Sequence, residues 1–236
     1  MPPLDSPHPE PVEGRGRTRN LADVRFWIFD LDNTLYPPEC EFLAMIDARM
    51  TEWVSAETGL EPAEALKLQR SMLDEHGTTL AGLMARYGIE PNRFLDEVHD
   101  VSHERLVPDP ALRAAIARLP GRRLVFTNGS ARHAYAVLDS LELRDLFDDV
   151  FHLQSADLTP KPQRAAYDAF IRLHGVDPHA SAFFEDSARN MEPAAALGMT
   201  TVLVNCRLDA PQPAFVHHRT ERLEPFLSAL SFREAA

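Results

Sequence analysis

The sequence predicts an α/β protein in which a Rossmann-like parallel sheet is covered by helices on both faces and an all-helical segment is inserted after the first strand. Two observations carry this prediction. Short apolar runs that suit buried strands alternate with helical patterns over residues 108–205. Between this part and an earlier apolar run at residues 24–29 lies a long stretch with helical periodicity throughout.

The first ordered element is a strand. Residues 24–29 read VRFWIF, a run of β-branched and aromatic residues that ends abruptly in the polar sequence DLDNT. A continuous apolar run of this length is typical of a strand buried on both faces. The strand should therefore deliver polar side chains at its carboxyl end.

A helical segment follows at residues 39–104. Its first apolar stripe ends at Gly59 and Pro62, and breaks at Gly77 and at residues 88–91 separate three further helices. We expect this segment to form a small domain of its own, held by ordinary apolar packing. The first stripe has a spacing of four residues and consists of Phe42, Ile46, Met50 and Val54.

The rest of the chain alternates between strands and helices. Such alternation predicts parallel strands, and in parallel sheets the ligand crevice lies beyond the carboxyl ends of the strands. The core domain is therefore expected to comprise residues 21–38 and 105–236. Expected strands lie at residues 123–127, 150–153, 182–184 and 201–204, and expected helices at residues 110–119, 131–141, 162–174, the stretch ending at 197, and 222–230.

Composition restricts the classes of partner and the compartment. The formal net charge of −12 disfavours binding to a nucleic acid polymer, and no apolar run approaches the roughly 18 to 20 residues that span a bilayer. Two cysteines are too few for a disulfide framework and fit a reducing compartment. Residues 1–20 are rich in proline, glycine and charge and lack the apolar region of a secretory signal, so we expect a disordered tail on a cytoplasmic protein.

Four polar clusters follow successive predicted strands. Taken singly, each cluster also suits a turn or a helix cap. Their occurrence in this order at strand ends favours a functional site. The clusters are Asp30-Leu31-Asp32-Asn33-Thr34, Thr127-Asn128-Gly129, Lys161-Pro162 and Glu185-Asp186-Ser187.

The acidic residues of these clusters predict a cation site. Asp30 and Asp32 are two positions apart at a strand end, so their side chains point to one side and repel each other. Glu185 and Asp186 should converge on the same crevice. Hard oxygen ligands of this kind suit Mg²⁺, which takes one or two carboxylates, water and substrate phosphate oxygens.

The remaining clusters predict a phosphate site. Lys161 can neutralise both a carboxylate and phosphoryl oxygens, and Thr127 supplies a hydroxyl donor. The backbone amides of Asn128 and Gly129 precede a helix whose dipole favours an anion. His133, close to the amino end of that helix, is a candidate for substrate contact.

Residues 24–205 resemble the haloacid dehalogenase-like phosphohydrolases, with FDLDNTLY, FTNG, KP and FFEDS as their four motifs. The resemblance implies a nucleophilic Asp30, an acid/base Asp32, and phosphate binding by Thr127 and Lys161. It also implies a magnesium ion held by Asp30, the Asp32 carbonyl and Asp186, and a helical C1-type cap over residues 39–104. The segments DNTLYPP, TNGSARH and FFEDSARN are most similar to the pyrimidine 5'-nucleotidase branch.

The sequence departs from the common family pattern at the fourth motif. Many such phosphatases have Gly-Asp there and a second aspartate four residues after the first, whereas this chain has Glu185 and Asn190. Glu185 is therefore expected at the metal either as a ligand or in its outer shell, with Asn190 as the alternative outer-shell partner.

The expected reaction is hydrolysis of a small phosphomonoester through an aspartyl-phosphate on Asp30, with the pKa of Asp32 raised so that it can exchange a proton. Within the same superfamily, a phosphoglycolate or sugar-phosphate phosphatase and a phosphomutase are alternatives. A haloacid dehalogenase is disfavoured because a leaving halide needs no acid such as Asp32. A phosphate-binding protein without catalysis is the alternative of another class.

Overall fold

The computed structural model describes residues 20–232, so the predicted tail lies almost entirely outside the described residues. Within residues 20–232, six strands form one sheet in the order β3-β2-β1-β4-β5-β6, and every neighbouring pair is parallel. The predicted α/β class with a parallel sheet is confirmed. The strands are β1 Phe26–Phe29, β2 Arg122–Phe126, β3 Asp149–Phe151, β4 Ser181–Glu185, β5 Thr200–Leu203 and β6 His218–Arg219.

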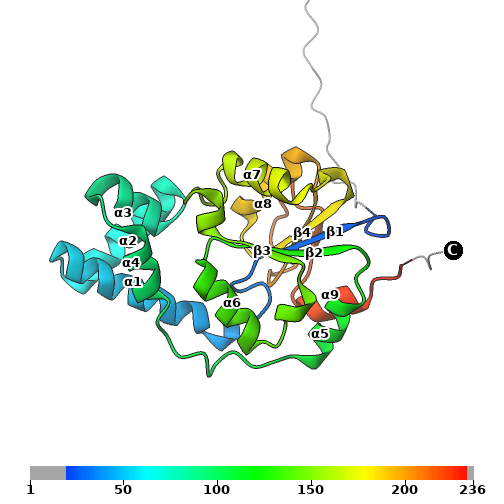
Figure 1. Cartoon of the computed structure of the whole chain (residues 1–236), viewed down its shortest axis with the longest axis horizontal. Coiled ribbons are helices and arrows are strands. Elements are labelled where there is room, and N and C mark those ends of the chain that lie inside the picture. Colours follow the sequence, from blue (N-terminus) through cyan, green and yellow to red (C-terminus); the bar gives the residue numbers. More distant parts are fainter. Residues whose placement is uncertain (1–19, 233–236) are drawn as a thin grey trace, which may run out of the picture.

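Helices cover both faces of the sheet (Figure 1). The side chains of β1 show why: Trp27 and Phe29 belong to one buried apolar cluster and Ile28 to another, because successive residues of a strand point to opposite faces. One face carries α5 Pro110–Ala117, α6 Ala131–Ser140 and α9 Leu223–Ser228, and the other carries α7 Arg164–His174 and α8 Ala188–Leu197. Short 3-10 turns occur at Pro38–Cys40, Arg144–Leu146, Leu153–Ala156 and Pro178–Ala180.

The helical insert lies at one end of the sheet (Figure 1). Its helices start at prolines that suit a first helical turn or end at glycines with positive φ, as the sequence predicted. Trp53, Phe94 and Val98 are among the buried residues of an apolar cluster that belongs chiefly to this insert. The helices are α1 Phe42–Thr58, α2 Pro62–His76, α3 Thr79–Tyr87 and α4 Pro91–Val98.

The order of the strands brings the predicted clusters together. β1 lies between β2 and β4, so the polar residues that follow β1 and β2 meet those at the end of β4 at one edge of the sheet. Lys161 comes from the segment between β3 and α7. None of the described helices is both long and apolar enough to cross a membrane.

Candidate active site

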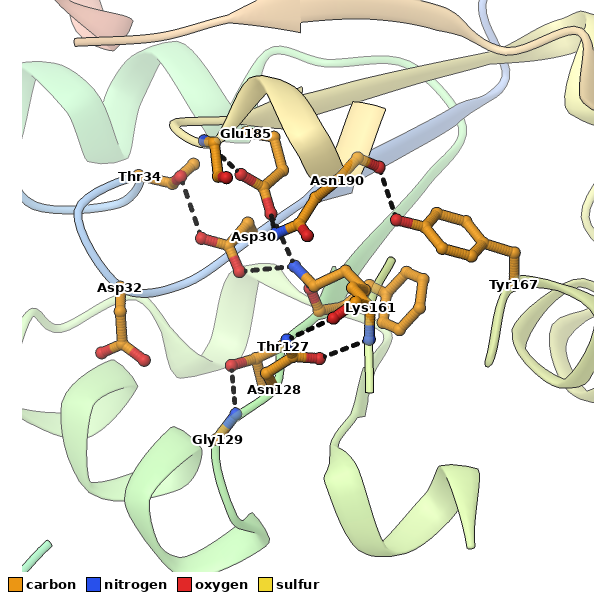
Figure 2. Close-up of polar contacts among 12 residues, drawn as sticks. Asp30, Asp32, Thr34, Thr127, Asn128, Gly129, Lys161, Tyr167, Glu185 and Asn190 are labelled. Atoms are coloured by element: carbon orange, nitrogen blue, oxygen red, sulfur yellow. Dashed lines mark hydrogen bonds and ion pairs between the residues drawn. The ribbon is translucent and has the colours of Figure 1, made fainter. Parts of the chain in front are cut away.

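Asp30 and Lys161 form the centre of the site (Figure 2). Nζ of Lys161 donates to Asp30 Oδ1 at 2.7 Å, and the hydroxyl of Thr34 donates to Asp30 Oδ2 at 3.1 Å. Lys161 also donates to the Phe126 carbonyl at 2.8 Å and to Glu185 Oε1 at 3.0 Å. With 1% of its surface exposed, Lys161 uses its three donors within the protein and is held in one place.

Asn128 fixes the backbone that carries Lys161. The Lys161 amide donates to Asn128 Oδ1 at 2.8 Å, and Asn128 Nδ2 donates to the Lys161 carbonyl at 3.1 Å. This reciprocal pair joins the loop after β2 to the segment that follows β3 across 33 residues of chain. The sequence predicted phosphate binding by the backbone amide of Asn128, and the structure shows that its side chain positions Lys161.

Carboxylate oxygens of Asp30, Glu185 and Asp186 lie within 4.8 Å of one another and could hold a metal ion. Burial, with repulsion from neighbouring carboxylates, raises the pKa of Asp30 to about 7 despite attraction to Lys161. Burial and repulsion from Asp30 and Glu185 raise the pKa of Asp186 to about 8. One lysine does not compensate three carboxylates, so the cluster fits a hard divalent cation such as Mg²⁺.

Glu185 is the most constrained of these acids. It is 1% exposed, and its Oε2 accepts the Ser187 amide at 2.5 Å. Its Oε1 accepts from Lys161 and from Asn190 Nδ2, the latter at 2.5 Å. Because protein donors occupy both oxygens, the geometry fits a supporting position beside the cation better than a direct ligand.

The Asp32 side chain lies apart from this cluster (Figure 2). Its Oδ1 accepts from the Tyr36 hydroxyl at 2.7 Å and contacts His133 Nε2 at 2.8 Å. Burial favours a raised pKa, but attraction to His133 and hydrogen bonds from His133 and Tyr36 outweigh it, so the pKa of Asp32 is lowered. The predicted increase in this pKa is wrong for the free site, because donors from two segments stabilise the charged carboxylate.

His133 is fully buried beneath the site. Its side chain has 0% exposure and does not line the cavity, so the residue predicted to contact substrate reaches Asp32 instead. The ring stacks on His99, with centroids 4.2 Å apart and planes 16° apart. Burial lowers the pKa of His99 to about 3, so this second ring is neutral near pH 7.

The loop predicted to bind phosphate is held by a hydrogen bond within it. Thr127 is 2% exposed, and its Oγ1 accepts the Gly129 amide at 2.9 Å. A Cβ on Gly129 would lie 2.8 Å from His133 Cδ2 and 3.2 Å from Thr127 Oγ1, so the backbone here requires glycine. Ser130 caps α6 through a hydrogen bond from the His133 amide, which places the amino end of α6 at the site.

A cavity of about 1050 Å³ opens over these residues and reaches into the helical insert. Every predicted site residue except His133 lines this cavity. The lining residues are Asp30, Asp32, Thr127, Asn128, Gly129, Lys161, Glu185 and Asp186. The insert contributes an apolar wall and the charged side chain of Arg70. The apolar wall includes Leu43, Ile46, Met50, Leu80, Phe94 and Val98.

The family model of the haloacid dehalogenase-like hydrolases matches residues 25–198, which is most of the chain. The protein belongs to this family. The expectation drawn from the four motifs is thereby confirmed at the level of a haloacid dehalogenase-like hydrolase with a Rossmann-like core.

A curated relative from Saccharomyces cerevisiae, "Phosphate metabolism protein 8", is 26% identical over 196 residues. The match covers 76% of this chain but only 61% of the yeast protein. This hydrolase therefore spans less than two thirds of that relative.

Solved structures show the same fold. A phosphatase of this family from Thermococcus onnurineus has a TM-score of 0.59 at 17% identity, covering 87% of this chain and 97% of the other. The hydrolase YfnB from Bacillus subtilis has a TM-score of 0.56 at 16% identity, and an L-2-haloacid dehalogenase from Xanthobacter autotrophicus has 0.55 at 17%, both with the same coverage.

Several functional contacts of this hydrolase were not predicted from its sequence. Thr34 and Tyr36 each lie four residues after the carboxylate they contact, so the spacing within DNTLY was an available signal. His99 and Arg70 reach the site from the insert, and no sequence pattern around either residue indicates this position. Four other polar residues of the insert, Arg49, His76, Arg86 and Tyr87, do not line the cavity.

Proposed function

We propose that this hydrolase is a magnesium-dependent phosphatase that cleaves small phosphomonoesters through an aspartyl-phosphate on Asp30. The observation that carries the proposal is the pairing of Asp30 with a fully enclosed Lys161 at the base of a cavity. Nζ of Lys161 contacts the carboxylates of Asp30 and Glu185, and the cavity opens over this group. A phosphoryl group placed there meets a nucleophile, a cation and the amino end of α6 together.

In the proposed first half-reaction, an Asp30 oxygen forms a bond to phosphorus while the bond from phosphorus to the leaving oxygen breaks. Asp32 gives its proton to that leaving oxygen. In the second half-reaction, water attacks phosphorus, the bond to Asp30 breaks, and the proton from water passes to Asp32. The negative charge of bound phosphate raises the pKa of a neighbouring carboxyl, which counteracts the lowered pKa of Asp32 in the free site.

Asp30 and Asp186 are the side chains that would hold Mg²⁺, with the Asp32 carbonyl as the family pattern implies and Glu185 beside them. When bound, the ion supplies positive charge to the phosphoryl oxygens and compensates the crowded carboxylates. The YfnB structure from Bacillus subtilis, which shares this fold, is bound to magnesium. That neighbour and the raised pKa of Asp30 support the metal assignment.

The substrate class that we propose is the pyrimidine 5'-nucleotides, with phosphoglycolate and sugar phosphates as the runner-up. Support comes from DNTLYPP, TNGSARH and FFEDSARN and from the cavity, whose volume of about 1050 Å³ and apolar wall suit a base and a ribose. The name of the yeast relative refers to phosphate metabolism and agrees with a phosphate ester as substrate. The overall charge of −12 supports a small ligand rather than a nucleic acid polymer.

The test is release of inorganic phosphate from UMP, CMP, AMP, GMP, phosphoglycolate and a hexose phosphate, with magnesium and with excess EDTA. We expect turnover that EDTA abolishes and magnesium restores, with the pyrimidine nucleotides having the highest kcat/KM. Preference for phosphoglycolate or a hexose phosphate by about tenfold, or about 1.4 kcal/mol, would reject the nucleotidase assignment alone. Chloride release from 2-chloropropionate without phosphate release would favour a dehalogenase. The absence of any reaction would favour a phosphate-binding protein without catalysis.

A further inference from the structure

The two oxygens of the Asp32 carboxyl have different surroundings. Oδ1 is bound by Tyr36 and His133 at 2.7 and 2.8 Å. Within residues 20–232, no hydrogen bond reaches Oδ2. Oδ2 lies 3.7 Å from the place a Cβ would take on Gly129, a point that is also 3.2 Å from Thr127 Oγ1. The protein therefore holds one oxygen and presents the other beside the loop predicted to bind phosphate.

His133 is held firmly enough to orient that carboxyl. Its ring is flanked by His99 at 4.2 Å and by Phe42 at 6.1 Å, with interplanar angles of 16° and 4°. Its amide donates to Ser130 Oγ at 3.2 Å, and the same oxygen contacts His99 Nδ1 at 3.4 Å. Both flanking rings belong to the helical insert or its end, so the insert clamps the ring against the core.

The polar atoms of this ring indicate its task. His133 Nδ1 is buried without a hydrogen-bond partner among the described residues, so contact with Asp32 is the ring's one polar interaction there. An apolar side chain would fill the same space without the cost of burying Nδ1. The ring does not line the cavity, although Asp32 does. Among the side chains that line the cavity, Asp32 is the one that the His133 ring contacts through a hydrogen-bonding atom, so the polar effect of His133 on a ligand passes through Asp32.

We propose that His133 is a positioning residue that holds the Asp32 carboxyl by Oδ1, so that Oδ2 is the oxygen that gives and receives the proton. This inference rests on the proposed function, because it takes Asp32 as the acid/base group. In the first half-reaction the proton passes from Oδ2 to the leaving oxygen as the bond between phosphorus and that oxygen breaks. In the second, a proton from the attacking water returns to Oδ2 as the bond between phosphorus and Asp30 breaks.

Leaving groups of different basicity separate this role from a merely structural one. The 4-nitrophenolate ion leaves without a proton, whereas the alkoxide of benzyl phosphate needs one, and both substrates carry an aromatic group of similar size. The ratio kcat/KM reports only steps up to formation of the aspartyl-phosphate, so the later common hydrolysis does not obscure the comparison. A misplaced acid should therefore harm benzyl phosphate selectively.

The variants are His133→Leu, His133→Gln and His133→Asn. At saturating magnesium, His133→Leu should lower kcat/KM for benzyl phosphate by about tenfold to hundredfold and for 4-nitrophenyl phosphate by less than about threefold. The glutamine amide can reach and donate to Oδ1, so His133→Gln should recover most of the loss. The asparagine side chain is too short to reach Oδ1, so His133→Asn should show the same selective loss as His133→Leu. His133→Asn therefore replaces His133→Leu in the test if the leucine variant does not fold.

His174→Leu is the matched control. His174 is also a buried histidine and packs against Phe151 and Phe170. It contacts Asp149 at the amino end of β3, whereas the site lies at the carboxyl ends of the strands. Its loss should leave the ratio of the two substrates unchanged. Equal losses on both substrates, or failure of glutamine to rescue, would overturn the positioning role while leaving the phosphatase standing. No phosphate release by the unmodified protein from either ester would overturn the proposed function and this inference with it.

Discussion

Replacing Asp30 with asparagine should stabilise the metal-free protein while removing its activity. Asp30 is 7% exposed and lies within a cluster that includes Glu185 and Asp186. Burial and repulsion outweigh attraction to Lys161 and raise the pKa of Asp30 from an ordinary 3.8 to about 7. The folded protein therefore resists ionisation of the residue that its proposed chemistry needs as an anion.

The size and sign of the effect follow from proton linkage. Because the folded state holds this proton more tightly than the unfolded chain, stability falls as the pH rises from 3.8 to about 7, and the loss is complete above that range. At about 1.4 kcal/mol for each tenfold change in acidity, the loss has an upper limit of about 4 kcal/mol. Asparagine does not ionise, so Asp30→Asn escapes this loss.

Thermal unfolding in EDTA measures the difference. About 1 kcal/mol corresponds to about 2 to 4 °C for a protein of this size, so Asp30→Asn should raise Tm by several degrees near pH 8 and by less near pH 5. Saturating magnesium should narrow the gap, because the cation compensates the carboxylates of the wild type. Phosphate release by Asp30→Asn should be absent at every pH.

The exposed carboxylate of Asp74, on α2, provides the control, and Asp74→Asn should leave Tm unchanged. A lower Tm for Asp30→Asn near pH 8, or a difference that does not change with pH, would refute the reasoning. Turnover by Asp30→Asn above a few per cent of the wild type would remove Asp30 from the nucleophile role.

Three further variants test the surroundings of the site. Asn128→Ala removes both hydrogen bonds to the Lys161 backbone and should lower the free energy of unfolding by about 1 to 3 kcal/mol in denaturant titrations, with reduced kcat; unchanged stability would contradict this. Asn190→Ala releases one donor from Glu185 and should raise the magnesium concentration for half-maximal activity by about tenfold, whereas an unchanged value would exclude Asn190 from metal support. Arg70→Ala removes an exposed cation from the cavity wall and should raise KM by about twofold to fivefold at low salt with kcat preserved; a fall in kcat alone would contradict a binding role.

Most of the fold could be predicted because buried parallel strands are continuous apolar runs. The runs at residues 24–29 and 182–184 are examples, and they lie in the neighbouring strands β1 and β4. β6 was not predicted, because its two residues, His218 and Arg219, have no apolar pattern. They form a strand by pairing with β5. α7 begins at Arg164 rather than Pro162, after a segment whose backbone is bound to Asn128.

The residues of the candidate site can be predicted from the sequence, because the polar clusters follow predicted strands and parallel strands end at a common edge of the sheet. What several of these residues contact depends on the tertiary structure. His133 contacts Asp32, which is 101 residues away along the chain. Both carboxylate oxygens of Glu185 accept hydrogen bonds from protein donors. The pKa of a side chain and its hydrogen-bond partners depend on charges and donors that come from separate segments of the chain. The spacing of residues within one segment therefore does not predict them.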